Sequence, residues 1–343
     1  MTLLMIDGFD DQLASKWNGS LAFSSSGRNG HAGYSNDNTN GFYKQVAAAD
    51  ENATFIVGVA FKPITAPSSS YAFGLGLLSD SAATTHVSVN VTSAGSVEVR
   101  RGATHGTYTY TGGTLLGTAS VTLSAGVWVY VELKVLLSDT VGTVDLHLDG
   151  YSALSLTGQD TKNGGTKTVF DTLQVLQYSN AYGLVDDLYL ANGAGSINND
   201  FIGDCVVETL YPNGNGSSSQ FTGSDGNSTD NYLLVDEAGA PSTSDYVEDA
   251  TATDRDLYVM TDLAHASATI KGIQLNAYAA KSDAGAKSIK NVLKSGSTTT
   301  AYTAQTLSTT YAAKVNLVEL NPDTSTAWTN ATVAAIECGV EAV

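Results

Sequence analysis

The sequence has few of the residues that hold small extracellular proteins or membrane proteins together. Its 343 residues include two cysteines, Cys205 and Cys338, and five prolines. Two cysteines cannot build a disulfide framework, and we expect both to be free, buried thiols in a reducing cytosol. No apolar run approaches the roughly 18 residues that a membrane-spanning helix needs. The amino terminus lacks the basic region and cleavage site of a secretory signal, so we expect synthesis in the cytoplasm.

Basic residues are also scarce. Lysine and arginine number 16 against 34 aspartates and glutamates, which gives a formal net charge of −18 at pH 7. Nucleic acids and anionic membranes attract proteins largely through lysine and arginine. The charge therefore excludes nucleic acid as a partner, and we expect no insertion into a membrane. Charged residues make up 15% of the chain, against roughly 25% in typical globular domains, so uncharged polar side chains must cover much of the surface.

The usual patterns of catalytic and metal-binding residues are missing as well. No His-Glu-x-x-His, Cys-x-x-Cys or Gly-x-Ser-x-Gly sequence occurs, and these are the spacings of zinc sites and serine nucleophiles. The five histidines are scattered, and we expect His86 and His147 at the surface of strands. Asp145 and Asp149 share a strand face with His147, but we interpret this set as non-catalytic. The sequence predicts no enzyme, no catalytic or cofactor-binding residue, no cofactor and no metal site.

Two loops have the alternating polar residues of cation-binding loops. Residues 36–41 lack an acidic first ligand, and Ala47 stands where a bidentate glutamate belongs. Residues 225–230 form the second loop. We interpret both as asparagine-rich turns, and calcium binding through carbonyl groups is the alternative.

Alternation of apolar and polar residues dominates the sequence. In residues 127–135 the odd positions are apolar and the even positions are larger or charged, and residues 144–148 repeat the pattern. This period of two predicts strands with one buried face. Residues 87–91 and 97–99 predict a hairpin, and the apolar residues 55–61 predict a central strand. The sequence therefore predicts an all-β protein with two β-sandwich or jelly-roll domains.

A small, polar segment at residues 191–196 separates two parts of the chain. We expect a jelly-roll β-sandwich in residues 1–195 and a second β-sandwich in residues 196–343, opening with a strand at residues 205–210. Ten acidic residues lie between positions 225 and 262. The acidic stretch could pair with lysines of the same domain, which we favour, or dock on a neighbouring copy. The lysines are Lys271, Lys281, Lys287, Lys290 and Lys294.

Five motifs follow one another in the first part. They are residues 6–10 (IDGFD), Trp17, residues 128–134 (WVYVELK), residues 142–150 (GTVDLHLDG) and residues 185–190 (VDDLYL). Their order and spacing resemble the laminin G-like, concanavalin A-type jelly roll. The resemblance implies that the first and last strands lie side by side. The glucanase members of that superfamily carry a Glu-x-Asp-x-Glu strand, which this chain lacks, and the departure argues against hydrolysis.

The second part has its own ordered set of motifs. They are residues 201–204 (FIGD), 210–214 (LYPNG), 235–237 (VDE), 245–247 (DYV), 256–258 (DLY), 327–329 (AWT) and 337–340 (ECGV). This order resembles the C-terminal half of tailed-bacteriophage virion proteins that place a laminin G-like domain ahead of a second β domain. The resemblance implies a virion structural, fibre or decoration protein.

We therefore expect a non-enzymatic bacteriophage virion surface protein, either a capsid decoration or a short head or tail appendage. It would be made in the host cytoplasm and contact other virion proteins, such as major capsid or tail proteins. The second domain would serve virion docking or self-association in a homo-oligomer, with a trimer as our guess. The alternatives are a tail fibre or carbohydrate-binding module that recognises a host surface glycan, and then a polysaccharide hydrolase. Tyr108, Tyr110, Tyr130 and Tyr278 are candidates for stacking on sugars, although packing in a core or interface is the favoured interpretation.

Overall fold

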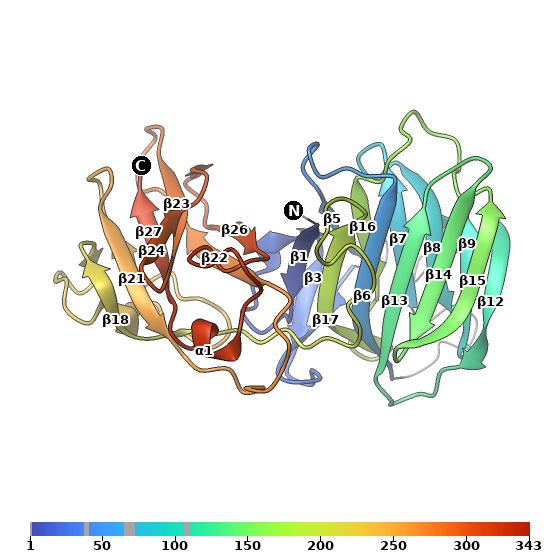
Figure 1. Ribbon diagram of the computed structural model, residues 1–343, viewed down its shortest axis with the longest axis horizontal. Coiled ribbons are helices and arrows are strands. Elements are labelled where there is room, and N and C mark those ends of the chain that lie inside the picture. Colours follow the sequence, from blue (N-terminus) through green and yellow to red (C-terminus); the bar gives the residue numbers. More distant parts are fainter. Residues whose placement is uncertain (1, 38–40, 65–72, 106–109) are drawn as a thin grey trace. The chain divides into compact units, whose positions relative to one another are not determined.

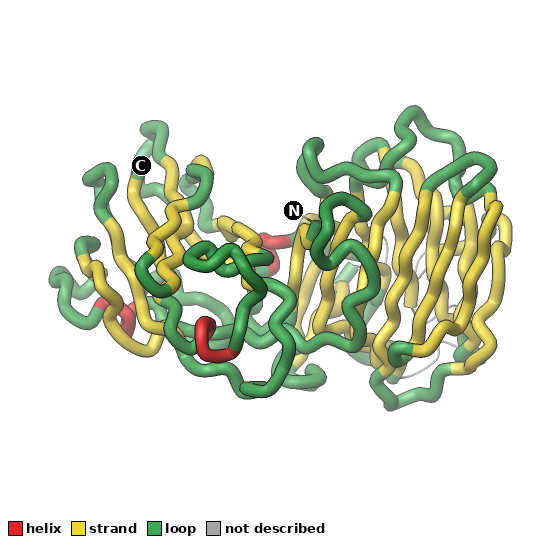
Figure 2. Tube along the Cα trace, viewed as in Figure 1, coloured by secondary structure: helices red, strands yellow, loops and turns green. Residues whose placement is uncertain are grey.

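The regular secondary structure is almost entirely β-strand, joined by many loops and turns, as Figures 1 and 2 show. The computed structural model describes residues 2–37, 41–64, 73–105 and 110–343. Backbone contacts divide the chain into two compact units. Unit 1 comprises Met1–Phe9 and Trp17–Val207, and unit 2 comprises Asp10–Lys16 and Glu208–Val343. The predicted all-β class is confirmed, and each unit is described by itself.

Unit 1 is a sandwich of two antiparallel sheets, with β13, β14 and β15 in front of β7, β8, β9 and β12 in Figure 1. The first sheet runs in the order β15 (Tyr151–Gln159), β14 (Gly142–Leu148), β13 (Val129–Leu136), β6 (Thr54–Pro63), β17 (Gly183–Asn192), β4 (Ala32–Ser35) and β3 (Leu21–Ser24), and β1 (Leu3–Asp7) also pairs with β17. The second sheet runs in the order β12 (Thr114–Thr122), β9 (Ser96–Arg101), β8 (Thr84–Val91), β7 (Phe73–Ser79), β16 (Thr172–Leu176), β5 (Phe42–Gln45) and β2 (Asn18–Gly19). A small ribbon joins β10 (Thr104–His105) to β11 (Tyr110–Thr111).

The core of unit 1 follows from the alternation in the sequence. Val131 and Leu133 of β13 and Val144 of β14 are fully buried in one apolar cluster. The hairpin expected from residues 87–99 is confirmed by the pairing of β8 with β9. The expected central strand is confirmed as β6, which lies between β13 and β17, and β1 pairs with β17 as the resemblance implied. Val127 is an exception to the predicted pattern, because it precedes β13 and is exposed.

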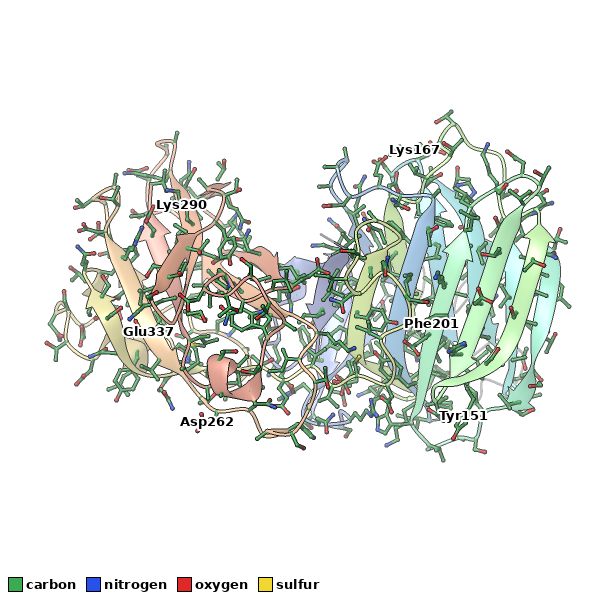
Figure 3. The ribbon with its side chains drawn as sticks, viewed as in Figure 1. Tyr151, Lys167, Phe201, Asp262, Lys290 and Glu337 are labelled. Atoms are coloured by element: carbon green, nitrogen blue, oxygen red, sulfur yellow. The ribbon has the colours of Figure 1, made fainter. Side chains whose placement is uncertain are left out.

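The outer face of the first sheet is covered by residues 196–207, which we call the covering segment. The ring of Phe201, labelled in Figure 3, packs on His147 with ring centroids 4.2 Å apart. The Gly203 amide donates a hydrogen bond to Oε1 of the buried Glu132 over 2.9 Å. His147 is therefore half-covered by an aromatic ring, and this sheet face offers no open groove at Glu132.

The strand expected at residues 205–210 is not formed, so that prediction was wrong. The Val207 amide donates to Asp187 Oδ1 over 2.8 Å, and the Cys205 carbonyl accepts from Arg28 over 3.1 Å. Side chains thus take the hydrogen bonds that a neighbouring strand would have taken. These contacts carry unit 1 to Val207, beyond the predicted boundary at residue 195.

Unit 2 is assembled from smaller sheets. Its main sheet runs in the order β18 (Pro212–Ser219), β21 (Arg255–Met260), β27 (Glu337–Ala342), β23 (Ser288–Ser295) and β24 (Thr298–Ala301), and β25 (Gln305–Thr306) also pairs with β23. Two ribbons join β19 (Thr222–Gly223) to β20 (Val247–Glu248) and β22 (Ile273–Ala279) to β26 (Ala312–Val318). The short helical segments are η1 (Ala14–Lys16), η2 (Asn231–Leu234) and α1 (Asn330–Val333). The core gathers Leu275, Leu293, Val318, Trp328, Val333 and Ile336.

The segment Asp10–Lys16 belongs to unit 2 although it lies near the amino terminus. The Ser15 hydroxyl accepts a hydrogen bond from the Ala313 amide over 2.9 Å, and Asp11 accepts one from the Asn276 side chain over 2.9 Å. Both partners lie on the β22–β26 ribbon. The chain therefore enters unit 2 briefly before it builds most of unit 1, which a single predicted boundary did not anticipate.

Two of the lysines of unit 2, Lys290 and Lys294, pair within the unit, and their partners lie outside the acidic stretch at residues 225–262. Lys290 and Lys294 of β23 bind Glu341 and Glu337 of β27, each over 2.6 Å (Figure 3). Lys290 and Lys294 are directly opposite Glu341 and Glu337 where β23 pairs with β27, so these carboxylates are within their reach. The intramolecular interpretation holds for these lysines, with a different partner from the one expected.

Both cysteines are free thiols, as expected, and both are half-buried. Cys338 lies on β27, and burial raises the pKa of its thiol to about 12. Only the thiolate is a strong nucleophile, so Cys338 stays in its inert thiol form at neutral pH.

Unit 2 also buries a carboxyl group without a cation beside it. Asp256 is fully buried, and its Oδ2 accepts from the Asn231 side chain over 2.6 Å and from the Tyr258 hydroxyl over 2.9 Å. Within the described residues, Asp256 Oδ1 and Asn231 Oδ1 have no hydrogen-bond partner. Burial raises the pKa of Asp256 above the ordinary aspartate value.

This carboxyl group predicts a loss of stability with rising pH. The folded chain holds the Asp256 proton to a higher pH than the unfolded chain, so stability falls between the two pKa values. Asp256→Asn keeps an acceptor for Asn231 and Tyr258 and cannot ionise. We expect the difference in unfolding free energy, variant minus wild type, to increase from pH 4 to pH 7 in denaturant titrations. A variant that loses stability relative to wild type over that range would contradict the assignment.

Candidate functional site

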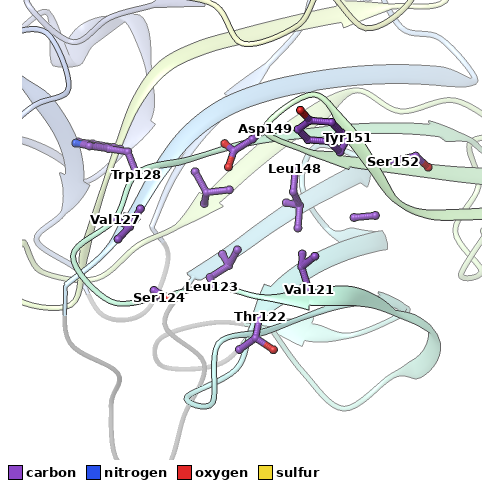
Figure 4. Close-up of a pocket in the computed structure, with 12 residues that line it drawn as sticks. Val121, Thr122, Leu123, Ser124, Val127, Trp128, Leu148, Asp149, Tyr151 and Ser152 are labelled. Atoms are coloured by element: carbon purple, nitrogen blue, oxygen red, sulfur yellow. The ribbon is translucent and has the colours of Figure 1, made fainter.

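One end of the unit 1 sandwich is hollowed between the edges of its two sheets. The cavity has a volume of about 430 Å³ and lies between the end of β12, the loop that follows it and the β14–β15 turn (Figure 4). Its lining residues are Val121, Thr122, Leu123, Ser124, Val127, Trp128, Val129, Leu148, Asp149, Tyr151, Ser152 and Ala153. The site is therefore made of strand ends and two turns, at a place where the packed core gives way to solvent.

The β14–β15 turn forms one wall and is held rigidly. Asp149 and Gly150 have positive φ angles of 51° and 78°, as a two-residue type I′ hairpin turn requires. The Asp149 side chain accepts a hydrogen bond from the Tyr130 amide over 2.8 Å, and the Asp149 amide donates to the Tyr130 carbonyl over 2.8 Å. This pair of bonds ties the turn to the start of β13 and fixes the residue that follows, Tyr151.

The most exposed of the large apolar and aromatic lining residues is a tyrosine. Tyr151 exposes 80% of its surface and lies at the rim in Figure 4, on the same wall as Asp149 and Ser152. Val127 and Val121 are also exposed, whereas Leu148 and Val129 are buried. An exposed tyrosine above an apolar floor offers a flat ring face together with a hydroxyl group that can hydrogen-bond.

A second aromatic ring lies at the other end of the cavity. The ammonium group of Lys62, on β6, lies 5.7 Å from the centroid of the Trp128 ring, in a cation–π arrangement. Among the lining residues that the structure describes, Asp149 has the one carboxyl group. The hollow therefore combines apolar walls, two aromatic side chains, hydroxyl groups and little charge, which suits an uncharged ligand with both apolar and hydroxyl faces.

The tyrosines singled out from the sequence lie elsewhere. Tyr110 and Tyr130 are buried, and their hydroxyl groups donate to Gln174 Oε1 over 2.6 Å and to the Asp187 carbonyl over 3.0 Å. Tyr278 stacks on Tyr311 with centroids 5.1 Å apart, and Tyr108 lies outside the described residues. Packing thus accounts for three of the four, as favoured, and Tyr151 was missed. The available signal was its position directly after an Asp-Gly turn.

Asp145 and His147 lie on β14 and Asp149 lies in the turn that follows, and the three side chains do not bond to one another. Asp145 accepts a hydrogen bond from the Ser155 hydroxyl over 2.6 Å, and Asp149 is tied to the β13 backbone. His147 is half-buried beneath Phe201. Each of these three side chains therefore has a separate partner.

His86 is fully buried, so the prediction of a surface histidine was wrong. Its Nδ1 accepts from the Asn163 amide over 3.0 Å, so the proton of the neutral ring is on Nε2, 2.7 Å from the Ser79 hydroxyl oxygen. Burial lowers the pKa of His86 to about 4. A ring that donates to Ser79 cannot also remove its proton, and Ser79 is itself buried. This serine–histidine pair is structural.

The two calcium-like loops give no metal centre in the described part of the chain. Residues 38–40 of the first loop lie outside the described residues. In the second, the Asp225 carboxylate accepts from the backbone and side-chain amides of Asn227 over 3.2 and 2.7 Å, which is how an asparagine-rich turn satisfies itself. Among the described residues, no group of three or more histidine, cysteine or acidic side chains could hold a metal ion. No described helix is long and apolar enough to cross a membrane.

Comparisons with known proteins bear on the fold. No protein family model and no curated protein matches the chain. Domain 4 of AbnA, a GH43 extracellular arabinanase from Geobacillus stearothermophilus, is 14% identical, covers 57% of this chain and 94% of its own, and has a TM-score of 0.36. Carbohydrate-binding module CBM66 from Bacillus subtilis is 13% identical over 51% of this chain and 91% of its own, with a TM-score of 0.29. A Trypanosoma rangeli sialidase mutant is 16% identical, covers 50% of this chain and 27% of its own, and has a TM-score of 0.33. At such identities the likeness concerns the β-sandwich fold alone.

Proposed function

We propose that this chain is a non-enzymatic surface protein whose unit 1 binds a neutral glycan in the cavity beside Tyr151. The proposal rests on one observation, the exposed Tyr151 ring fixed by a rigid turn at the rim of a hollow with apolar and hydroxyl walls. Sugar rings present apolar C–H faces and hydroxyl edges, and a tyrosine ring with nearby polar groups complements both. Ser152 and Thr122 supply hydroxyl groups in the same lining.

Charge favours a neutral sugar over an acidic one. The chain carries a net charge of −18, and the carboxylate of Asp149 faces the hollow. An anionic polysaccharide would approach against this field. The ammonium group of Lys62 lies against the Trp128 ring, at the opposite end from Tyr151.

The lining also favours binding over hydrolysis. Glycosidases place two carboxyl groups on either side of the scissile bond, about 5–10 Å apart. Among the described lining residues, Asp149 supplies the one carboxyl group, and one of its oxygens already accepts a hydrogen bond from the Tyr130 amide. A single, structurally engaged carboxylate does not supply the required acid and nucleophile or base.

We expect Tyr151→Ala to weaken binding of a neutral oligosaccharide at least tenfold. The loss of stacking area corresponds to about 1.4 kcal/mol or more, and Tyr151→Trp should retain binding. A glycan array identifies the sugar, and titration calorimetry on the full chain measures the affinity. Val141→Ala removes an exposed apolar side chain outside the cavity and should bind as wild type. Equal binding by Tyr151→Ala, or a preference for acidic glycans, would refute the site.

We also propose that the chain is a structural component of a tailed-bacteriophage virion surface, as a capsid decoration or a short appendage. The ordered motifs in both halves of the sequence support this, together with the β-sandwich build and the acidic surface. Many copies on one particle would raise a weak single-site affinity through avidity. Purified protein should add to pre-formed heads that lack it. Binding to tails alone would make it a tail component, and binding to neither would end the virion proposal.

A further inference from the structure

The two open sides of the unit 1 sandwich are protected very differently. On one side the edge strands are β2 and β3, with two and four residues. On the other side the edges are β12 and β15, with nine residues each, and they lie side by side. Very short edge strands are one of the ways in which proteins prevent pairing with other chains. The β12–β15 side lacks that protection.

The long edges also lack charge. Neither β12 (TLLGTASVT) nor β15 (YSALSLTGQ) contains a lysine, arginine, aspartate, glutamate or proline, although 15% of the chain is charged. Leu115 of β12 is an exposed apolar side chain outside the cavity, whereas the exposed Val121 and Tyr151 belong to the cavity lining. Charged residues and proline are the usual blocks on edge strands. Register shifts where β12 meets β9 and β15 meets β14 are irregularities of the inner ladders; they add no charge to the outer edge.

We propose that this uncharged edge is where a second copy of the chain docks, by antiparallel pairing of β15 with β15 about a two-fold axis near Ser155. Ser155 is the middle residue of β15, so the pairing is self-complementary and closes at two copies. The same axis brings β12 of one copy towards β12 of the other, because both edges lie on one side of the sandwich. The pairing goes beyond glycan binding and does not depend on it.

Electrostatics restricts where two copies of this chain can meet. Two chains of net charge −18 repel one another, so they meet most favourably at a surface without carboxylates. A nine-residue strand is about 30 Å long, and two sheets about 10 Å apart make a face of several hundred Å². This is smaller than the standard specific interface of about 800 Å² per partner and falls in the range of weak, transient contacts. We therefore expect a concentration-dependent dimer that strengthens when salt screens the repulsion.

The test is sedimentation of the full chain from about 1 to 100 μM. We expect the mass to rise from 35.5 kDa towards twice that value, and more readily at higher salt. Thr157→Lys and Thr118→Lys, at exposed edge positions outside the cavity lining, should weaken association at least tenfold and leave glycan binding unchanged. Val141→Lys adds the same charge in a loop and should dimerise as wild type.

The following results would overturn the inference. They are a monomer at 100 μM in high salt, dimerisation of the edge variants at wild-type strength, and equal loss of dimer in Val141→Lys. A trimer as the only assembly would also contradict a two-fold contact. Thermal unfolding of each variant confirms that loss of association is not loss of fold. Failure of glycan binding would leave each of these outcomes unchanged, so the two proposals fail separately.

Discussion

Gly58→Ala should destabilise unit 1 by about 3 kcal/mol, in the range for overpacking a core and breaking its hydrogen bonds. Gly58 lies on β6, in register with Tyr189 on β17 and Glu132 on β13. With no side chain at Gly58, the Tyr189 ring passes over β6 and donates its hydroxyl hydrogen bond to Glu132 Oε1 over 2.6 Å. A methyl group at position 58 would overlap that ring, which is almost fully buried and has no room to move.

The consequence reaches beyond one strand, because Glu132 Oε1 also accepts the Gly203 amide of the covering segment. Displacement of Tyr189 would leave a buried carboxylate with fewer donors and loosen residues 196–207. Denaturant unfolding measures the loss, and hydrogen exchange at the Gly203 amide reports the loosening. Gly214→Ala is a matched control, because its methyl group meets only the Val259 side chain at 3.8 Å. Wild-type stability of Gly58→Ala would contradict the three-strand contact.

Lys16→Ala should cost unit 2 about 3 kcal/mol, because it removes one partner of a buried ion pair. The Lys16 ammonium group lies 2.8 Å from Asp11 Oδ1, and the two side chains expose only 3% and 11% of their surfaces. Without the lysine, Asp11 would remain buried with the Leu13 amide and the Asn276 side chain as its donors. An unpaired buried carboxylate costs far more than a lost surface pair.

The double variant Lys16→Met with Asp11→Asn tests the cause. It removes both charges, so most of the stability should return. Lys162→Ala is the surface control, because the Lys162 ammonium group lies 3.5 Å from the carboxylate of Asp139, which is exposed. This variant should lose less than about 1 kcal/mol of unfolding free energy. Hydrogen exchange on β22 and β26 should report the Lys16→Ala loss. Loss confined to unit 1 strands would contradict the assignment of residues 10–16 to unit 2.

The sequence predicted those parts of the fold that depend on burial of one face. The alternation in β13 and β14 marks the core side correctly, because every second residue enters the apolar cluster, the odd positions in β13 and the even positions in β14. It failed where a side chain replaces a strand partner, as at Val207 and Asp187. It also failed at His86, where a polar position in the alternation is enclosed by Asn163 and Ser79 from other segments.

The candidate site was less accessible from the sequence than the fold. Its walls come from β12, the β12–β13 loop and the β14–β15 hairpin. The periodicity of a sequence indicates which face of a sheet a residue lies on, but it does not indicate which turns lie next to each other in the folded chain. In the sequence, nothing distinguishes Tyr151 from other tyrosines in strands. Its fixed position follows from the hydrogen bonds between Asp149 and the Tyr130 backbone, which hold the β14–β15 turn against β13. The uncharged edge, in contrast, could be read from the composition of residues 114–122 and 151–159 once their edge positions were known.

The most direct test of the account is a crystal structure of the full chain soaked with the neutral oligosaccharide that an array selects. The account predicts a sugar ring stacked on Tyr151, with hydroxyl groups bonded within the cavity between β12 and the β14–β15 turn. A sugar bound at any other surface, with this cavity empty at saturating ligand, would contradict it.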